Sequence, residues 1–138
     1  MMNANDAHIL VINPGSTSTK VAVYINDSVV FLKTIKHSVE ELSKFKRIAD
    51  QYEYRKNIIY KELQDAEIKL DLIKIVMGRG GLVKPIPAGV YKVNEAMKRD
   101  LRESQQEHAS NLGALIADDI AKQLPMAEAY IADPVVVD

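Results

Sequence analysis

Residues 9–24 read Ile9-Leu-Val-Ile-Asn-Pro-Gly-Ser-Thr-Ser-Thr-Lys-Val-Ala-Val-Tyr24, and this stretch decides the fold that we expect. The apolar run 9–12 predicts a buried strand, which the turn-forming residues Asn13-Pro14-Gly15 end. The alternating pattern of 21–25 predicts a second strand. Two strands joined by so short a turn must pair in antiparallel fashion.

The turn between these strands carries four consecutive hydroxyl side chains, those of Ser16, Thr17, Ser18 and Thr19, beside Gly15. Backbone N–H groups in such a concavity bind anions, and a glycine lets a ligand approach because it has no Cβ. The turn therefore predicts a phosphate site. The same residue types are common in ordinary Ser/Thr turns, so this second interpretation stays open on spacing alone.

Length and composition are typical of one globular domain that needs no covalent cross-link for stability. The chain has 138 residues, of which 47% are hydrophobic and 27% charged, with a net charge of -1. Such a chain can bury a core, and its charge argues against general affinity for nucleic acid or an anionic membrane. The lack of cysteine excludes disulfides and thiolate metal sites. Residues 1–8 lack the features of a signal peptide and no apolar run could span a bilayer, which predicts a cytoplasmic protein.

The rest of the chain predicts an α/β layer built on a mixed sheet. Three further strands are predicted, at 29–35, 70–77 and 127–132. Helices are predicted at 45–68 and after the N-caps Ser38, Asn94 and Ser110.

Other classes of site find little support in the sequence. A Walker pattern and a Gly-x-Gly-x-x-Gly fingerprint are both absent. The three histidines are scattered without metal-ligand spacing. We expect His8 and His37 to be structural.

Four motifs together resemble those of the acetokinase family, and of its butyrate kinases in particular. They are Asn13-Pro14-Gly15-Ser16-Thr17-Ser18-Thr19-Lys20, Gly78-Arg79-Gly80-Gly81-Leu82-Val83-Lys84-Pro85-Ile86-Pro87, Glu107-His108-Ala109-Ser110-Asn111-Leu112-Gly113 and Asp133-Pro134-Val135-Val136-Val137-Asp138. The resemblance spans residues 8–138. The first motif alone is moderately specific, whereas the four in this order are strongly so.

The resemblance implies a ribonuclease H-like domain of the superfamily that includes acetate kinases, sugar kinases and actin-like ATPases. Its mixed five-stranded sheet has flanking helices, its first three strands are antiparallel, and two further strands run parallel to the first. Residues 1–138 would be the N-terminal domain of a longer two-domain kinase, with the second domain absent. The apolar end 135–137 after an Asp-Pro turn favours such a fragment over a short chain whose tail docks as a strand.

The activity that the resemblance implies is reversible phosphoryl transfer between ATP and butyrate, or another short-chain carboxylate, with Mg²⁺. The products are butyryl phosphate and ADP, and the fragment alone would be inactive. The parent enzyme would be a cytoplasmic homo-oligomer without a nucleic-acid or membrane partner. The alternative is a non-catalytic phosphate- or nucleotide-binding module of the actin-like superfamily, which has no need of an arginine at an acyl site.

The first motif would bind the phosphates of ATP. By similarity, this role falls to Asn13, Gly15, Ser16, Ser18 and Lys20, and Asn13 would also help to hold magnesium. Two plainer interpretations stay open: Asn13 as the first residue of an Asx-Pro turn, and Lys20 as a surface charge on the second strand.

The other three motifs would supply the acyl and metal side of the site. Arg79 matches an arginine near the acyl carboxylate and the transferred phosphoryl group, which suits bidentate anion binding. Asp133 matches a strand-end aspartate that holds magnesium through water. Both also fit exposed turn positions. His108 and Asn111 would lie close to the acyl group, although His108 is equally explained as a residue at the start of a helix.

Overall fold

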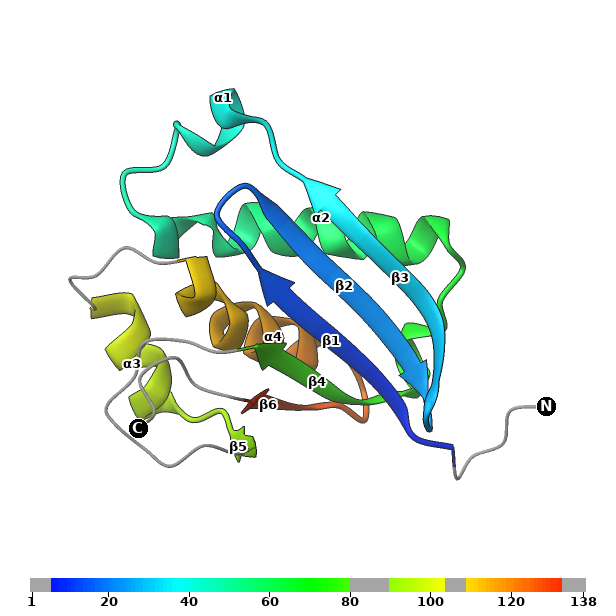
Figure 1. Ribbon diagram of the computed structural model, residues 1–138. Helices are drawn as coiled ribbons and strands as arrows, with labels where there is room; N and C mark the ends of the chain where they lie inside the picture. Colours follow the sequence, from blue (N-terminus) through cyan, green and yellow to red (C-terminus); the bar gives the residue numbers. More distant parts are fainter. Residues whose placement is uncertain (1–5, 80–89, 104–108, 133–138) are drawn as a thin grey trace.

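A computed structural model describes residues 6–79, 90–103 and 109–132 of the chain. The strands are β1 (His8–Pro14), β2 (Ser18–Ile25), β3 (Ser28–Lys36), β4 (Ile73–Arg79), β5 (Val90–Lys92) and β6 (Glu128–Ala132). The α-helices are α1 (Val39–Leu42), α2 (Tyr52–Asp65), α3 (Glu95–Glu103) and α4 (Leu112–Gln123). Three 3-10 helices complete the elements: η1 (Ile48–Gln51), η2 (Leu70–Leu72) and η3 (Ala109–Asn111). Figure 1 shows their arrangement.

The strands form one mixed sheet in the order β3-β2-β1-β4-β6-β5. The first three strands are an antiparallel meander, β4 runs parallel to β1, and β6 runs parallel to β4. This confirms the mixed sheet and its strand directions. The predicted number of five strands is wrong, because β5 adds a sixth strand that pairs antiparallel with β6. Its three residues are too few to show an alternating pattern in the sequence.

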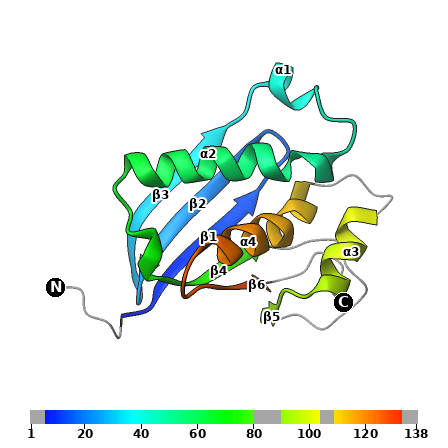
Figure 2. The same ribbon diagram turned by 180° about the vertical axis from the view of Figure 1, so that it is seen from behind.

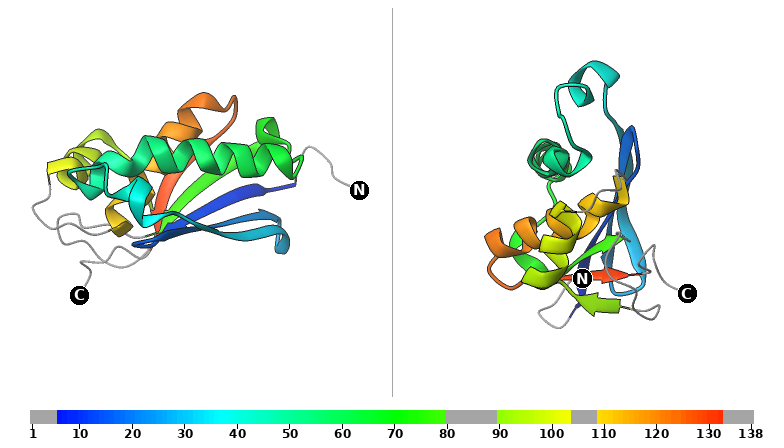
Figure 3. Two further views of the ribbon diagram at one scale, coloured as in Figure 1. Left: turned by 90° about the horizontal axis from the view of Figure 1, so that it is seen from above. Right: turned by 90° about the vertical axis from the view of Figure 1, so that its left-hand side faces the viewer.

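Helices α2 and α4 cover one face of the sheet, and no described helix covers the other (Figure 2, Figure 3). Alternate side chains of β1 and β2 point to the covered face, so Leu10, Ile12, Val21 and Val23 are buried there. Helix α4 packs on β4, β6 and β1. None of the helices in the described ranges is long and apolar enough to cross a membrane.

Element bounds differ from the predictions where short 3-10 turns intervene. The predicted helix 45–68 is divided, since η1 precedes α2 and the α-helix covers only Tyr52–Asp65. The predicted strand 70–77 begins later, at Ile73, because η2 takes up the first three residues. A 3-10 turn and an α-helix share the same local composition, so the apolar pattern does not separate them.

Side-chain caps begin two of the helices as predicted. Ser38 and Asn94 each accept a hydrogen bond from the backbone N–H three residues later, at 3.1 and 2.9 Å. The third predicted cap is wrong by one residue. Ser110 lies inside η3, and the residue before α4 is Asn111, which makes no side-chain cap bond.

Two buried lysines join other helices to α4. Lys56 of α2 is 2.8 Å from Asp119, and Lys98 of α3 is 2.7 Å from Asp118. Burial acts to lower the pKa of Lys98, but hydrogen bonds to Asp118 and Glu95 hold that pKa above its ordinary value. Lys98 therefore stays charged, and its ion pairs hold α3 beside α4.

The edge strand β3 exposes apolar side chains. Val29, Val30 and Leu32 are 51%, 49% and 60% exposed. Lys33 and Lys36 follow them along the strand and are exposed as well.

Strand β4 and helix α4 touch through two glycines. A Cβ on Gly78 would lie 2.3 Å from the carbonyl oxygen of Gly113, and a Cβ on Gly113 would lie 2.7 Å from that of Arg79. Neither position has room for a side chain. The first turn of α4 therefore rests directly on the end of β4 and fixes the backbone of Arg79 at the edge of the sheet.

We expect Gly78→Ala to lower the free energy of unfolding by roughly 1–3 kcal/mol, because the added methyl group forces backbone atoms to move. Gly15→Ala is the matched control, since its Cβ would meet only atoms of Ser18, at 3.4 Å or more. Urea unfolding of both variants measures the difference. Equal stabilities would contradict the close contact of β4 with α4.

Candidate active site

The hairpin between β1 and β2 turns within three residues. The backbone N–H of Gly15 donates to the carbonyl oxygen of Ser18 at 2.7 Å and closes the turn. Ser16 and Thr17 at its tip are exposed. Within the described part of the chain, neither their N–H groups nor their hydroxyls bond to another protein group. The tip therefore offers unused donors to a ligand, as the sequence predicts for a phosphate turn.

The carbonyl groups of the same turn are held from behind by Arg55 of α2. Its Nη1 donates to the carbonyl oxygens of Gly15 and Ser18 at 2.6 and 2.9 Å. Its Nη2 donates to that of Ser16 at 3.1 Å. Arg55 is fully buried. The hairpin is thus bonded to the helix layer through its own backbone.

Arg55 is oriented by Gln51, one helical turn earlier. The Oε1 atom of Gln51 accepts from Nε and Nη2 of Arg55 at 3.1 and 2.8 Å. Burial lowers the pKa of Arg55 from its ordinary value to about 10, so the guanidinium remains charged at neutral pH. Its acceptors in the described residues are all neutral oxygens, including Thr19 Oγ1 at 3.2 Å. No carboxylate among them neutralises this charge.

His37 completes the buried polar cluster behind the hairpin. Its Nε2 lies 2.7 Å from the hydroxyl oxygen of Thr19, and its backbone N–H donates to the carbonyl of Thr17 at 2.9 Å. The ring packs edge-on against Tyr54, with 5.6 Å between ring centroids. Burial, followed by the positive charge of Arg55, lowers the pKa of His37 from 6.5 to about 4. The imidazole is therefore neutral at physiological pH and has a structural role, as expected.

On the open face of the sheet, one pocket brings together Asn13, Lys20 and Arg79. Asn13 and Lys20 are register partners on β1 and β2, so their side chains lie on the same face. Arg79 is the last residue of β4 and lies at the same end of the strands as Asn13. The pocket has a volume of about 270 Å³, and its other lining residues are Val11, Ala22, Tyr24 and Leu32. Two cations and no acid line it among the described residues, which suits an anion.

Of the other predicted site residues that the structure describes, Gly15, Ser16, Ser18 and Asn111 do not line this pocket. Asn111 is 2% exposed at the start of α4, behind the sheet. His108 and Asp133 lie outside the described residues. The structure does describe the carboxyl end of β6, which lies beside the end of β4 because Ala132 pairs with Arg79. In the described ranges, no group of three acidic or histidine side chains could hold a metal ion.

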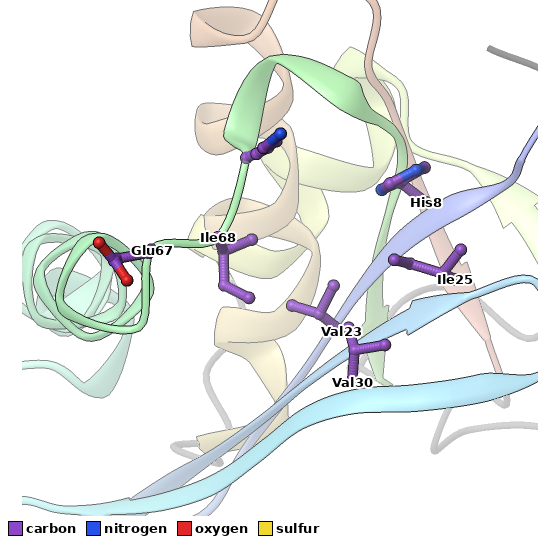
Figure 4. Close-up of a pocket in the computed structure, with 7 residues that line it drawn as sticks. His8, Val23, Ile25, Val30, Glu67 and Ile68 are labelled. Atoms are coloured by element: carbon purple, nitrogen blue, oxygen red, sulfur yellow. The ribbon is translucent and has the colours of Figure 1, made fainter. Parts of the chain in front are cut away.

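A second hollow lies at the opposite end of the strands, near the start of β1 (Figure 4). Its volume is about 120 Å³ and its lining is mostly apolar. It is lined by His8, Val23, Ile25, Val30, Glu67, Ile68 and Lys69. None of the predicted site residues in the described ranges lines it.

Arg55 and Gln51 are site residues that the sequence interpretation missed. Both lie on the buried stripe of η1 and α2, at steps of four residues from Ile59 and Leu63, which are also buried. A long polar side chain at a core position needs buried partners. Polar residues at these otherwise apolar positions could have indicated a buried polar cluster. They do not indicate which residues Arg55 and Gln51 contact.

Two curated relatives align with nearly the whole chain. The probable butyrate kinase of Bacteroides thetaiotaomicron is 56% identical over 130 residues, which is 94% of this chain and 36% of that protein. Butyrate kinase 1 of Clostridium acetobutylicum is 50% identical over 131 residues, 94% of this chain and 37% of that protein. The chain is a homologue of butyrate kinases. It spans little more than a third of the length of these relatives.

Solved structures agree on the fold of this butyrate kinase homologue. Acetate kinase from Entamoeba histolytica superposes with a TM-score of 0.57 at 18% identity, over 96% of this chain and 35% of that chain. Such identity establishes the fold alone, which is the acetate kinase-like form of the actin-like ATPase fold. No protein-family model matches the chain.

We expect the imidazole of His37 to titrate near pH 4. The unfolded chain takes up this proton near pH 6.5, so the stabilisation is complete above about pH 6.5. As the pH falls to about 4, the folded state loses roughly 2–3 kcal/mol from this group. An NMR titration of the histidine rings measures the pKa directly.

Urea unfolding of the wild type and of His37→Leu, at about pH 7.5 and about pH 4.5, isolates the contribution of His37 from those of the carboxylates. The wild type should lose more stability than the variant on acidification. An equal loss in both proteins would contradict the buried neutral state of His37.

Proposed function

We propose that this chain forms the phosphate-binding and carboxylate-binding part of an ATP-dependent carboxylate kinase. The enzyme would transfer a phosphoryl group reversibly between ATP and butyrate, or a similar short-chain acid, giving the acyl phosphate and ADP. One observation carries the proposal: Asn13, Lys20 and Arg79 share a cationic pocket beside a hairpin whose tip donors bond to no other group in the described part of the chain. The names of the curated relatives support a carboxylate as the acceptor.

Phosphoryl transfer needs positioning and charge neutralisation more than covalent help from the protein. The N–H and hydroxyl groups at the hairpin tip, with Lys20, would bind the phosphates. Arg79 would bridge the carboxylate and the transferred group, since a guanidinium can donate to two anions at once. The backbone of Gly15 does not require a glycine, and a Cβ there would make only van der Waals contact with Ser18, at 3.4 Å or more. A glycine at this position is therefore consistent with close approach of a ligand to the turn.

Magnesium would be held largely by phosphate oxygens and water. In the described pocket the amide oxygen of Asn13 is the available hard ligand. We propose that the carboxylate of Asp133 supplies the negative charge that the described lining residues lack. The bound ion would neutralise charge on the phosphates of ATP.

The rest of the site would come from residues beyond the described pocket. We propose that residues 1–138 form the first of two domains, and that a second domain contacts the adenosine and closes over the open face of the sheet. His108 and Asn111 would lie on the acyl side. The complete enzyme would act in the cytoplasm as a homo-oligomer.

Arg79→Ala should abolish formation of acyl phosphate while leaving ATP binding nearly intact, because this side chain would contact the acyl and transferred groups only. The assay is hydroxylamine trapping of the acyl phosphate, made on the complete protein with whatever sequence continues its reading frame. Arg99→Ala, an exposed arginine of α3, is the control. Full activity of Arg79→Ala would exclude the proposed role. ATP binding without any acyl phosphate in the wild type would favour the non-catalytic alternative.

Lys20→Ala should weaken binding of MgADP by about tenfold, because it removes one of the two cations in the pocket. Lys61→Ala makes the same change of charge on the exposed side of α2, and it should bind as the wild type does. Isothermal titration calorimetry at low salt measures both. Equal weakening in the two variants would point to net charge alone and contradict a contact by Lys20.

A further inference from the structure

All four carbonyl oxygens of residues 15–18 accept hydrogen bonds from residues outside the turn. Arg55 donates to those of Gly15, Ser16 and Ser18, and the backbone N–H of His37 donates to that of Thr17. One buried side chain thus bonds three of the four carbonyls, and the residue after β3 bonds the fourth. The turn is therefore held by Arg55 as well as by its own hydrogen bond from the Gly15 N–H to the Ser18 carbonyl.

The direction of the carbonyls decides the direction of the N–H groups. In a planar trans peptide the C=O and N–H bonds point opposite ways. The peptide from Gly15 to Ser16 is held through the Gly15 oxygen, and the next is held through the Ser16 oxygen. Arg55 alone makes both contacts, at 2.6 and 3.1 Å. It thereby directs the N–H groups of Ser16 and Thr17 away from itself, and these are the unused donors at the tip.

We propose that Arg55 is a positioning residue, held by Gln51, that shapes the hairpin for a phosphate group by directing the N–H groups of Ser16 and Thr17 toward it. The proposal rests on the proposed function of the hairpin as a phosphate site. It goes further by assigning the selectivity of that site to a side chain on α2 that touches no ligand. Without Arg55 the two peptides could rotate, and an anion would meet carbonyl oxygens as often as N–H groups.

Two variants test the proposal, one by changing Arg55 and the other by removing the acceptor on Gln51. Arg55→Lys keeps the positive charge but loses the fork that reaches the three carbonyls. Gln51→Leu keeps Arg55 itself and removes the acceptor that orients it. Lys56→Met is the control, because it removes a neighbouring buried cation of α2 that pairs with Asp119 and does not touch the hairpin. All three should lower the melting temperature.

The first readout is an NMR titration of the ¹⁵N-labelled complete protein with inorganic phosphate and with MgADP. The wild type should show shifts of the Ser16 and Thr17 amide signals on binding. Arg55→Lys and Gln51→Leu should weaken binding at these amides by at least about tenfold, whereas Lys56→Met should stay within about twofold. In the hydroxylamine assay, the KM for MgATP should rise by a similar factor while the KM for the carboxylate changes little.

The possible results separate this inference from the proposed function. If neither phosphate nor MgADP shifts the wild-type amides of Ser16 and Thr17, the hairpin is not a phosphate site and the proposed function is wrong. If the wild type binds and both variants bind as well as Lys56→Met, Arg55 only stabilises the fold and the inference is overturned. Should Arg55→Lys fail to fold, Gln51→Leu decides alone by the same comparison.

Discussion

The rest of the site depends on the contact between the Arg55 guanidinium and the backbone of the β1–β2 turn. A buried cation needs its donors satisfied, and Arg55 finds five acceptor groups on the turn, on β2 and on Gln51. The contact therefore couples α2 to the turn: neither can shift without leaving a charge or several carbonyls unpaired. It also makes the turn part of the core, although its tip is exposed.

Register and close packing bring the other groups to the same edge of the sheet. Antiparallel pairing sets Asn13 opposite Lys20, and parallel pairing carries β4 alongside until Arg79 reaches the same end. The two glycines at the contact of β4 with α4 let the helix start close to Arg79. In α/β sheets ligands bind beyond the carboxyl ends of the strands, and the proposed site lies at the carboxyl ends of β1 and β4.

Local patterns in the sequence predicted the features that depend on interactions between residues near one another in the chain. The turn after β1, the antiparallel pairing of the first three strands and the caps at Ser38 and Asn94 follow from residues close together in the chain. The parallel directions of β4 and β6 were expected from the family resemblance alone. Arg55 contacts residues about forty positions away, and a single sequence holds no distance between them. The strand β5 gave no signal because its pairing with β6 depends on the whole sheet. Of the predicted site, Asn13, Lys20 and Arg79 meet in one pocket, while Asp133 and His108 stay predictions.

The exposed edge strand β3 bears on how the chain behaves at high concentration. Among the described strands it pairs only with β2, so its outer backbone groups, flanked by Val29, Val30 and Leu32, resemble a template for another strand. The exposed Lys36 makes two such edges repel each other, whereas the charge of Lys33 is paired with Glu62 of α2. Since dissolved ions screen charges beyond about 10 Å at 0.1 M, purified material should self-associate more readily as salt is added, and it should stay dispersed best in dilute buffer.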